Sequence, residues 1–170
     1  MLIHIRKTLL IIFNMTKSNY HLYFGKAGHL FVMAEFLLRG WNVAIPEVDE
    51  GDDIFVVRHE DGKLIRVQVK TSNAKTTSDY FSATFSIGTQ QLTDISKEDI
   101  VYVFLVRKDN HWESPLIITR ENLLDILMTS GLNKNAKSQT IRLSFKDNKV
   151  LIKQIDLTEY QNNFEDFIIF

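Results

Sequence analysis

The 170-residue chain contains no cysteine, only two prolines and seven glycines, and it carries almost no net charge. Because cysteine is absent, disulfides, thiolate metal sites and cysteine nucleophiles are excluded. The 20 Lys and Arg residues are balanced by 21 Asp and Glu residues, so the protein is not a general polycation that coats nucleic acids. The lack of cysteine also fits a reducing compartment, and we expect a cytoplasmic protein.

Long apolar segments and flexible linkers are missing as well. The apolar run Leu9–Phe13 is far shorter than the roughly 20 residues that span a bilayer, and no small-residue cleavage site follows it. We therefore expect no membrane partner. The length fits one domain, which we divide into an N-terminal extension at 1–20, a core at 21–128 and an appended basic hairpin and helix at 129–170.

The apolar pattern predicts an α/β domain. Apolar residues fill 100–106 without a break, which is typical of a central strand covered on both faces. The expected elements are, in order, a helix at Ala27–Arg39 stopped by Gly40, strands at Trp41–Ile45, Asp53–Arg58, Lys63–Thr71 and Phe81–Ile87, a helix at Thr89–Ile95, a strand at Ile100–Val106, a helix from Thr119 to Met128, a hairpin of Ile141–Phe145 and Val150–Ile155 around Asp147-Asn148, and a last short helix at Glu159–Phe167.

Carboxylates gather just before the second expected strand, where five lie within seven residues: Glu47, Asp49, Glu50, Asp52 and Asp53. Hard oxygen ligands this close together favour a divalent cation such as Mg²⁺. For most of these residues we expect only a solvated acidic loop. Asp53 differs because it immediately precedes the apolar run of the strand, which fixes the direction of its side chain.

The strand at 63–71 places Arg66, Gln68 and Lys70 on one face and apolar residues on the other. Any half-buried strand shows such alternation for structural reasons alone. However, Gln68 and Lys70 are neighbours on that face, and Asp53 on the adjacent strand would complete a constellation for phosphoryl transfer. Asp53 and the Gln68 carbonyl would bind the metal, and Lys70 would orient or activate the attacking water and stabilise the developing charge.

These residues resemble the PD-(D/E)XK nuclease superfamily, which includes restriction enzymes, Holliday-junction resolvases, Mrr-like enzymes and a few homing endonucleases. The resemblance covers 24–106 and rests on Gly25–His29, Asn42–Pro46, Gly51–Ile54 and Val67–Thr71. It implies a restriction endonuclease-like αβββαβ core, with a mixed central sheet flanked by helices. It also implies an endonuclease that hydrolyses DNA phosphodiester bonds with Mg²⁺ or Mn²⁺.

Within this resemblance, Asp53 matches the first acid of the family and Lys70 matches its lysine. Gln68 stands at the position of the second acid, as in the Mrr-like variant. His29 departs from the pattern, because similar members carry a Glu there that contributes to the metal site. Imidazole is a poor Mg²⁺ ligand but suits Mn²⁺, and it can also act as a base or contact a phosphate. The alternative is a core histidine satisfied by a neighbour.

A second concentration of charge lies near the C-terminus. Between Gly131 and Ile155 the six basic residues outnumber one acid, Asp147, which gives a local charge of +5. Arg142 and Lys146 are expected on the outward face of the hairpin, where they would follow DNA phosphates. Lysines on an edge hairpin also block aggregation, so a purely structural explanation stays open. The predicted DNA-binding residues are Lys134, Lys137, Arg142, Lys146 and Lys149.

The sequence leaves a rival to the endonuclease. With His29 and Gln68 in place, Asp53 is the one acid among the three metal-site positions of the family, whereas Mg²⁺ normally needs one or two carboxylates plus substrate phosphates. Glu35 does not restore an acid, because we expect it to form an exposed ion pair with Arg39. The rival is a catalytically lapsed module that binds DNA or a protein; a small structural subunit is a third reading. The resemblance also implies a homodimer or tetramer.

Overall fold

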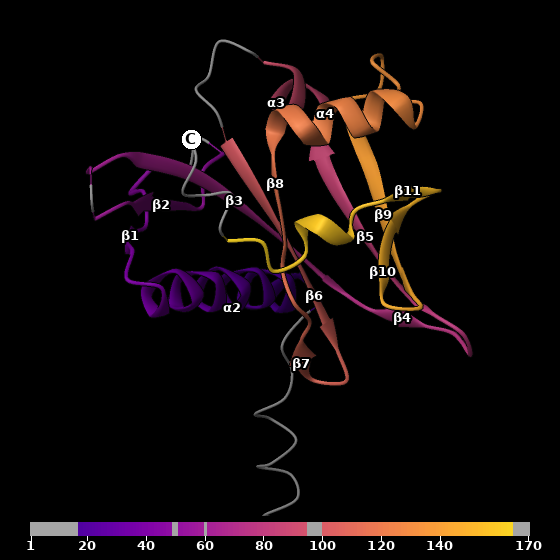
Figure 1. Ribbon diagram of the computed structural model, residues 1–170, viewed down its shortest axis with the longest axis horizontal. Coiled ribbons are helices and arrows are strands. Elements are labelled where there is room, and N and C mark those ends of the chain that lie inside the picture. The colour runs from indigo at the N-terminus through magenta and orange to yellow at the C-terminus, as the bar shows by residue number, and fades with distance from the viewer. Residues whose placement is uncertain (1–16, 49–50, 60, 95–99, 165–170) are drawn as a thin grey trace, which may run out of the picture.

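The computed structural model describes residues 17–48, 51–59, 61–94 and 100–164. In this part of the chain, two sheets pack with helices into the arrangement of Figure 1. The helices are α2 (Lys17–Leu38), α3 (Thr89–Thr93), α4 (Arg120–Thr129) and the short 3₁₀ helix η1 (Thr158–Tyr160). Within the described residues, no helix is both long enough and apolar enough to cross a membrane.

The first sheet, sheet A, is the expected mixed central sheet. Its strands are β1 (Asn42–Ala44), β2 (Ile54–Val57), β3 (Leu64–Asn73), β6 (Ile100–Lys108), β7 (His111–Trp112) and β8 (Leu116–Thr119). They follow the order β1-β2-β3-β6-β7, and β8 also pairs with β6. β3 and β6 run parallel, whereas the other neighbours are antiparallel. The helix-and-strand order of the predicted core is therefore confirmed.

The second sheet, sheet B, contains the predicted basic hairpin. Its strands are β4 (Lys75–Thr76), β5 (Phe81–Gly88), β9 (Ser138–Lys146), β10 (Lys149–Ile152) and β11 (Ile155–Asp156). Asp147 and Asn148, which link β9 to β10, both have positive φ, as a type I′ hairpin turn requires. β9 pairs with β5 along its whole length, from Gly88 opposite Ser138 to Phe81 opposite Phe145. This pairing joins the hairpin to the core.

Two ends of elements differ from the prediction. α2 begins at Lys17 rather than Ala27, because Phe24 is buried and Tyr20 stacks on it, so the preceding turns also have an apolar face to pack. Near the C-terminus, the described part of the expected helix at 159–167 contains only the end of the 3₁₀ turn η1, after which Phe164 packs edge-to-face on Phe36. Residues 1–16 and 165–170 lie outside the described residues, and the domain boundaries stay a prediction.

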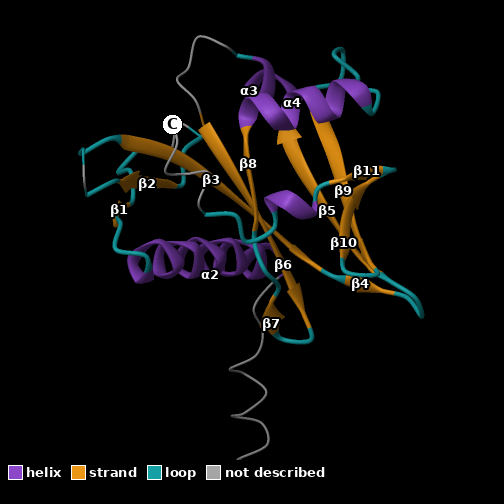
Figure 2. Cartoon of the chain, in the orientation of Figure 1, coloured by secondary structure: helices purple, strands orange, loops and turns teal. Residues whose placement is uncertain are grey.

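The core has two parts, one on each face of sheet A. α2 covers one face, where Val32 and Phe36 pack with Val67 and Val103 (Figure 2). Sheet B and α4 cover the other face, where Tyr102 belongs to a second buried cluster. Successive residues of β6 alternate between the two clusters, which is why the whole strand reads as apolar. The prediction that 100–106 forms a central strand is confirmed.

Candidate active site

Asp53 is held by main-chain hydrogen bonds at the start of β2. Its N–H donates to the Val67 carbonyl at 2.9 Å, which extends the β2–β3 ladder by one residue. Its carboxylate turns back toward β3, and Oδ2 accepts a hydrogen bond from the Val69 N–H at 2.7 Å. Since Ile54 pairs with Val67, Asp53 stands opposite Gln68. The strand therefore fixes the direction of this carboxylate, as the sequence indicated.

The carboxamide of Gln68 lies between Asp53 and Lys70. The side chain is buried, and one of its amide atoms lies 3.4 Å from Asp53 Oδ2. When that atom is the oxygen, it accepts a hydrogen bond from Lys70 Nζ at 3.1 Å, and the amide nitrogen donates to the Gly51 carbonyl at 2.8 Å. This orientation satisfies both ends of the amide. It also places an amide oxygen, a carboxylate oxygen and an ammonium group together.

His29 reaches the same place from α2. Its Nε2 lies 3.5 Å from Asp53 Oδ1, and the side chains of the two residues are 19% and 12% exposed. The approach of the helix depends on Gly28, since a Cβ there would clash with the side-chain methyl of Thr71 on β3. His29 thus points toward the carboxylate of the site, which is the neighbour that it contacts.

Gln91 of α3 joins the site, and the sequence did not point to it. With the Gln68 oxygen turned toward it, Gln91 Nε2 donates to that oxygen and, at 3.2 Å, to the Gly51 carbonyl; with Gln68 turned the other way, the Gln68 nitrogen donates to Gly51 instead. Gly51 has φ +99°, and a Cβ there would press against Gln91. The two amides and the loop before β2 therefore form one network. No periodic pattern or motif marks Gln91, because its partners are distant in the sequence.

Asp52 corrects one expectation. It was assigned to a solvated acidic loop, but it is only 6% exposed and forms an ion pair with Arg66 of β3. The guanidinium donates from Nε and Nη2 to the same carboxylate oxygen, Oδ2, at 2.9 and 2.6 Å. Glu47 of the same loop is exposed as expected, and residues 49–50 lie outside the described residues.

Tyr102 of β6 is a buried neighbour of the candidate site. In the parallel register of β3 and β6 it stands beside Gln68, and its side chain is fully buried. Burial raises the pKa of the Tyr102 hydroxyl well above its usual range; the charge of Asp52 raises it further, and the charge of Arg120 opposes the shift. The hydroxyl therefore stays protonated at neutral pH and is not a general base.

The side chains available to a metal are few. Among the described residues, no group of three or more His, Asp and Glu side chains is arranged to hold an ion. The oxygen and nitrogen donors of the site are the Asp53 carboxylate, the Gln68 amide and the His29 imidazole. Glu35 does not contribute, because it forms the predicted ion pair with Arg39 at 2.8 Å.

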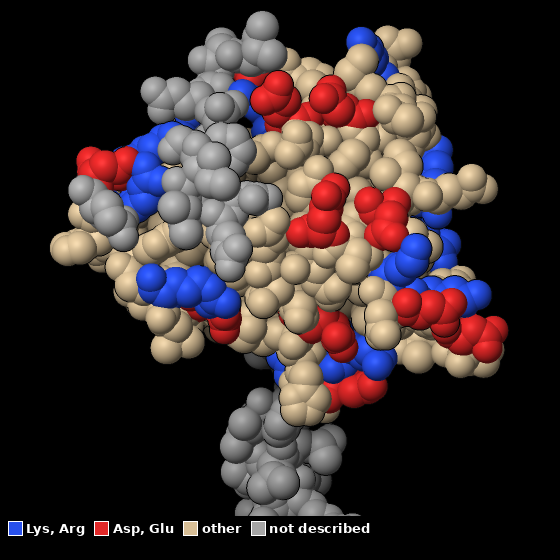
Figure 3. All heavy atoms as spheres, viewed as in Figure 1, with Lys and Arg blue, Asp and Glu red and all other residues tan. Residues whose placement is uncertain are grey.

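The predicted DNA-binding residues fall into separate places. Lys134 and Lys137 are exposed in the segment before β9, and Lys137 lines a cleft next to Gly51 and Gln91. Lys149 begins β10 and forms an ion pair with Asp156 at 3.2 Å. The face shown in Figure 3 carries charges of both signs, with Lys and Arg side chains at both its left and its right edges.

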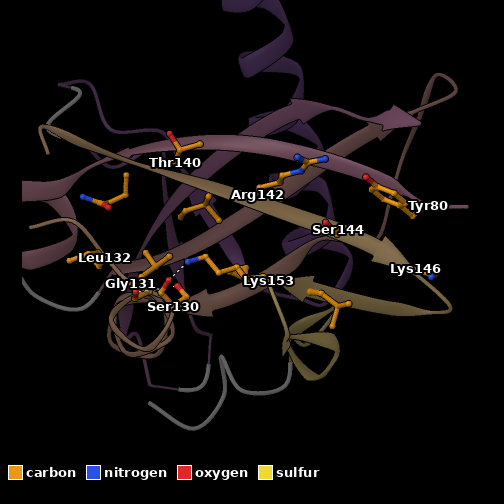
Figure 4. Close-up of a pocket in the computed structure, with 14 residues that line it drawn as sticks. Tyr80, Ser130, Gly131, Leu132, Thr140, Arg142, Ser144, Lys146 and Lys153 are labelled. Carbon is orange, nitrogen blue, oxygen red and sulfur yellow. Dashed lines mark hydrogen bonds between the residues drawn. The ribbon is translucent and has the colours of Figure 1, made fainter. Parts of the chain in front are cut away.

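Arg142 and Lys146 lie on the outward face of β9, as predicted, and line a groove of about 530 Å³ (Figure 4). Figure 4 shows Thr140, Arg142, Ser144 and Lys146 in a row along the strand, with Tyr80 at one end. Arg142 donates to the Ser82 hydroxyl at 3.3 Å. No acidic side chain lines this groove among the described residues.

Comparisons with known proteins identify the fold but no family. No protein-family model matches the sequence, and no curated protein matches it either. Among solved structures, the chain is similar to the bacterial homing endonuclease I-Ssp6803I. The TM-score is 0.52 at 15% sequence identity, and the match covers 91% of this chain and 92% of that one. At this identity the likeness shows the fold alone: a mixed α/β, nuclease-like fold.

Proposed function

We propose that the protein is a metal-dependent endonuclease that hydrolyses DNA phosphodiester bonds through a PD-(D/E)XK site of the Gln-x-Lys type. The observation that carries the proposal is the convergence of Asp53, Gln68 and Lys70 at the β2–β3 junction. The nuclease-like fold and its likeness to a homing endonuclease support it. DNA as the substrate comes from the resemblance and from that likeness, since the site itself fits any phosphodiester.

The donor set fits Mg²⁺ or Mn²⁺ at the lower limit of what such ions require. One carboxylate oxygen and one amide oxygen face the same point, and hard oxygen ligands suit both ions. Asp53 and Gln68 would hold the ion, with water and substrate phosphate as its remaining ligands. A bound ion would polarise the phosphoryl oxygen and lower the pKa of a bound water.

Each residue then has a distinct role. The Val69 N–H donates to Asp53 Oδ2 and fixes the direction of the carboxylate that would hold the ion. Lys70, hydrogen-bonded to Gln68, would orient the attacking water and offset the negative charge that develops on the phosphoryl group. His29 lies close enough to Asp53 to add a nitrogen ligand for Mn²⁺ or to contact a phosphate. The Lys70 ammonium and the ion would thus both stabilise the negative charge that develops on the phosphoryl group.

The rival function, a lapsed nuclease-like module that binds DNA or protein, is favoured by one observation. Among the described residues, Asp53 is the one carboxylate that faces the Gln68 amide and Lys70. Asp52 adds no second negative charge there, because Arg66 neutralises it. Such a module would bind DNA without a divalent ion. The two functions therefore differ in metal dependence, which an experiment can measure directly.

DNA would also contact the basic residues outside the site. The groove on β9 supports this role for Arg142 and Lys146, because it combines these two cations and Lys153 with hydroxyl groups and lacks acids among the residues described. Lys134 is exposed and stays a prediction, as does Lys137. Lys149 is the weakest candidate, since DNA would have to compete with Asp156.

The expected homodimer or tetramer has one candidate surface. α2 exposes Tyr23, Leu30 and Leu37, and the exposed Ala27 and Ala34 lie between them at spacings of three and four residues. An apolar stripe with this spacing pairs helices, and small residues let them approach closely. We propose that a second copy of the chain packs here, which light scattering of the full chain would test. The cytoplasmic location stays a prediction.

The test of the endonuclease is cleavage of supercoiled and branched DNA in Mg²⁺, in Mn²⁺ and in EDTA. Lys70→Met removes the ammonium but keeps a side chain of similar length, so cleavage should fall at least 100-fold, in the range seen when a charge-stabilising group is lost. Lys75→Met is the matched control, because Lys75 is exposed on β4 away from the site. Metal-independent cleavage, or full activity in Lys70→Met, contradicts the proposal. DNA binding without cleavage favours the lapsed module.

A further inference from the structure

A cleft of about 490 Å³ adjoins the candidate site on the side of α3. Gly51 and Gln91 belong to both places: they line the cleft, Gln91 contacts the Gln68 amide, and the Gly51 carbonyl accepts a hydrogen bond from one of these two amides. The walls of the cleft and of the site are therefore continuous. A strand whose phosphate lies at Asp53 and Lys70 would bring its neighbouring groups to this cleft.

Arg66 is fixed in one wall of the cleft. Its Nε and Nη2 both donate to Asp52, whose carboxylate is buried and holds the guanidinium from behind. Its second terminal nitrogen, Nη1, makes no hydrogen bond to any residue of the described chain. Arginine presents its donors in a planar fork that suits phosphate oxygens. Asp52 thus holds the Arg66 guanidinium in place, while Nη1 makes no hydrogen bond within the described chain.

Two further cations line the cleft from other elements. Arg120, the first residue of α4, is buried and donates from Nη1 to the Asp94 carbonyl at 2.5 Å. Lys137, in the segment before β9, is exposed and forms no ion pair within the described ranges. Among the described lining residues, they and Arg66 give three positive charges, against the two carboxylates of Asp52 and Asp94. Since Arg66 already neutralises Asp52, the cleft favours an anion over a cation.

We propose that this cleft binds a phosphodiester group of the DNA strand, next to the phosphate at Asp53 and Lys70. The inference rests on the proposed function and deepens it, because it assigns a second phosphate position that needs no metal ion. Arg66 supplies the directional contact and Lys137 an adjustable point charge. The shared wall at Gly51 and Gln91 favours a strand phosphate over free inorganic phosphate.

The test measures binding of a labelled DNA duplex in EDTA over a salt series. Each phosphate contact contributes about one unit to the slope of log K against log salt, so Lys137→Ala should make the slope less steep by about 1. Lys137→Arg keeps the charge and should keep the slope. Lys63→Ala, which removes an exposed charge just before β3, outside both the cleft and the groove on β9, should leave the slope unchanged.

A second measurement ties the lysine to one phosphate. Single phosphates flanking the cut position are replaced one at a time by uncharged methylphosphonate. At one flanking position this replacement should lower the affinity of the wild type for DNA. The same replacement should not lower the affinity of Lys137→Ala any further. An unchanged slope in Lys137→Ala, or no position with this coupling, overturns the cleft but leaves the endonuclease intact. Stabilisation by inorganic phosphate without DNA binding overturns both, since the ligand would then be the free ion.

Discussion

Asp52 and Asp53 are adjacent in the chain, and each carboxylate lies beside β3. Asp52 is buried, and the Arg66 guanidinium occupies one of its oxygens with two hydrogen bonds. Asp53 instead receives a main-chain N–H from Val69, and its other oxygen faces the imidazole of His29. The first carboxylate is matched by a full opposite charge, whereas the second is held in place without being neutralised by an Arg or Lys.

This difference separates two tasks that one acidic loop performs. A buried carboxylate paired with a half-buried guanidinium stabilises the fold, because breaking the pair leaves an uncompensated, partly desolvated charge. A carboxylate fixed by a backbone amide keeps its charge available to a cation or a substrate. The loop thus combines a structural anchor with a candidate ligand, one residue apart. The anchor also holds Arg66 at the cleft, so the two regions share a wall.

The largest effect is expected when the carboxylates of Asp52 and Asp53 are each replaced by an amide, which tests the comparison between them directly. Asp53→Asn removes the charge at the site, so metal-dependent cleavage should fall at least 100-fold, as when a group that stabilises the transition state is removed. Asp52→Asn leaves Arg66 without a counter-charge, so the free energy of unfolding should fall by about 2 kcal/mol. Cleavage rates at saturating DNA and urea unfolding measure the two effects.

Each variant serves as the control of the other. Asp53→Asn should lose less stability than Asp52→Asn, and Asp52→Asn should retain far more cleavage than Asp53→Asn. If both variants lose stability equally and neither differs from wild type in cleavage, the division of tasks between the two carboxylates is wrong.

The candidate site was largely predictable from the sequence, because its parts lie on adjacent strands. Asp53, Gln68 and Lys70 follow from a loop-to-strand junction and from alternation along one strand, and both signals are local. The pairing of Asp52 with Arg66 was not predictable, since a cluster of carboxylates gives no sign of which member is buried. That choice depends on a partner 14 residues away across the sheet.

The hairpins β9–β10 and β6–β7 show the same limit of prediction from the sequence. The sequence predicts a turn at Asp147-Asn148, and Asp109-Asn110 has the same residue types, also has positive φ at both residues and also joins two strands. The second hairpin was missed because β7 has only two residues, too few to show alternation. A turn signal is informative only when a strand pattern stands on both sides of it.

A smaller effect is expected at the contact between α2 and β3. Gly28→Ala places a methyl group against Thr71, so the helix must move away or the strand must shift. Overpacking of this kind should cost about 1–2 kcal/mol in the free energy of unfolding. It should also carry His29 away from Asp53 and reduce Mn²⁺-dependent cleavage. Gly25→Ala is the matched control, because a Cβ there meets nothing within 4 Å. Equal behaviour of the two variants would show that the close approach is unimportant.

The smallest effect is expected at Gln91, which contacts Gln68 of the candidate site and also lines the cleft. Gln91 touches no predicted metal ligand except the Gln68 amide, which it holds together with the Gly51 carbonyl. Groups that orient a metal ligand typically change activity or metal affinity by 10- to 100-fold when removed, and one amide contact belongs at the low end. Gln91→Ala should therefore raise the Mn²⁺ concentration needed for half-maximal cleavage about tenfold, with the rate at saturating Mn²⁺ nearly restored. Thr93→Ala, in the same helix but exposed and outside the cleft, is the control. A loss that saturating metal does not rescue would mean that Gln91 acts on the DNA in the cleft rather than on the orientation of Gln68.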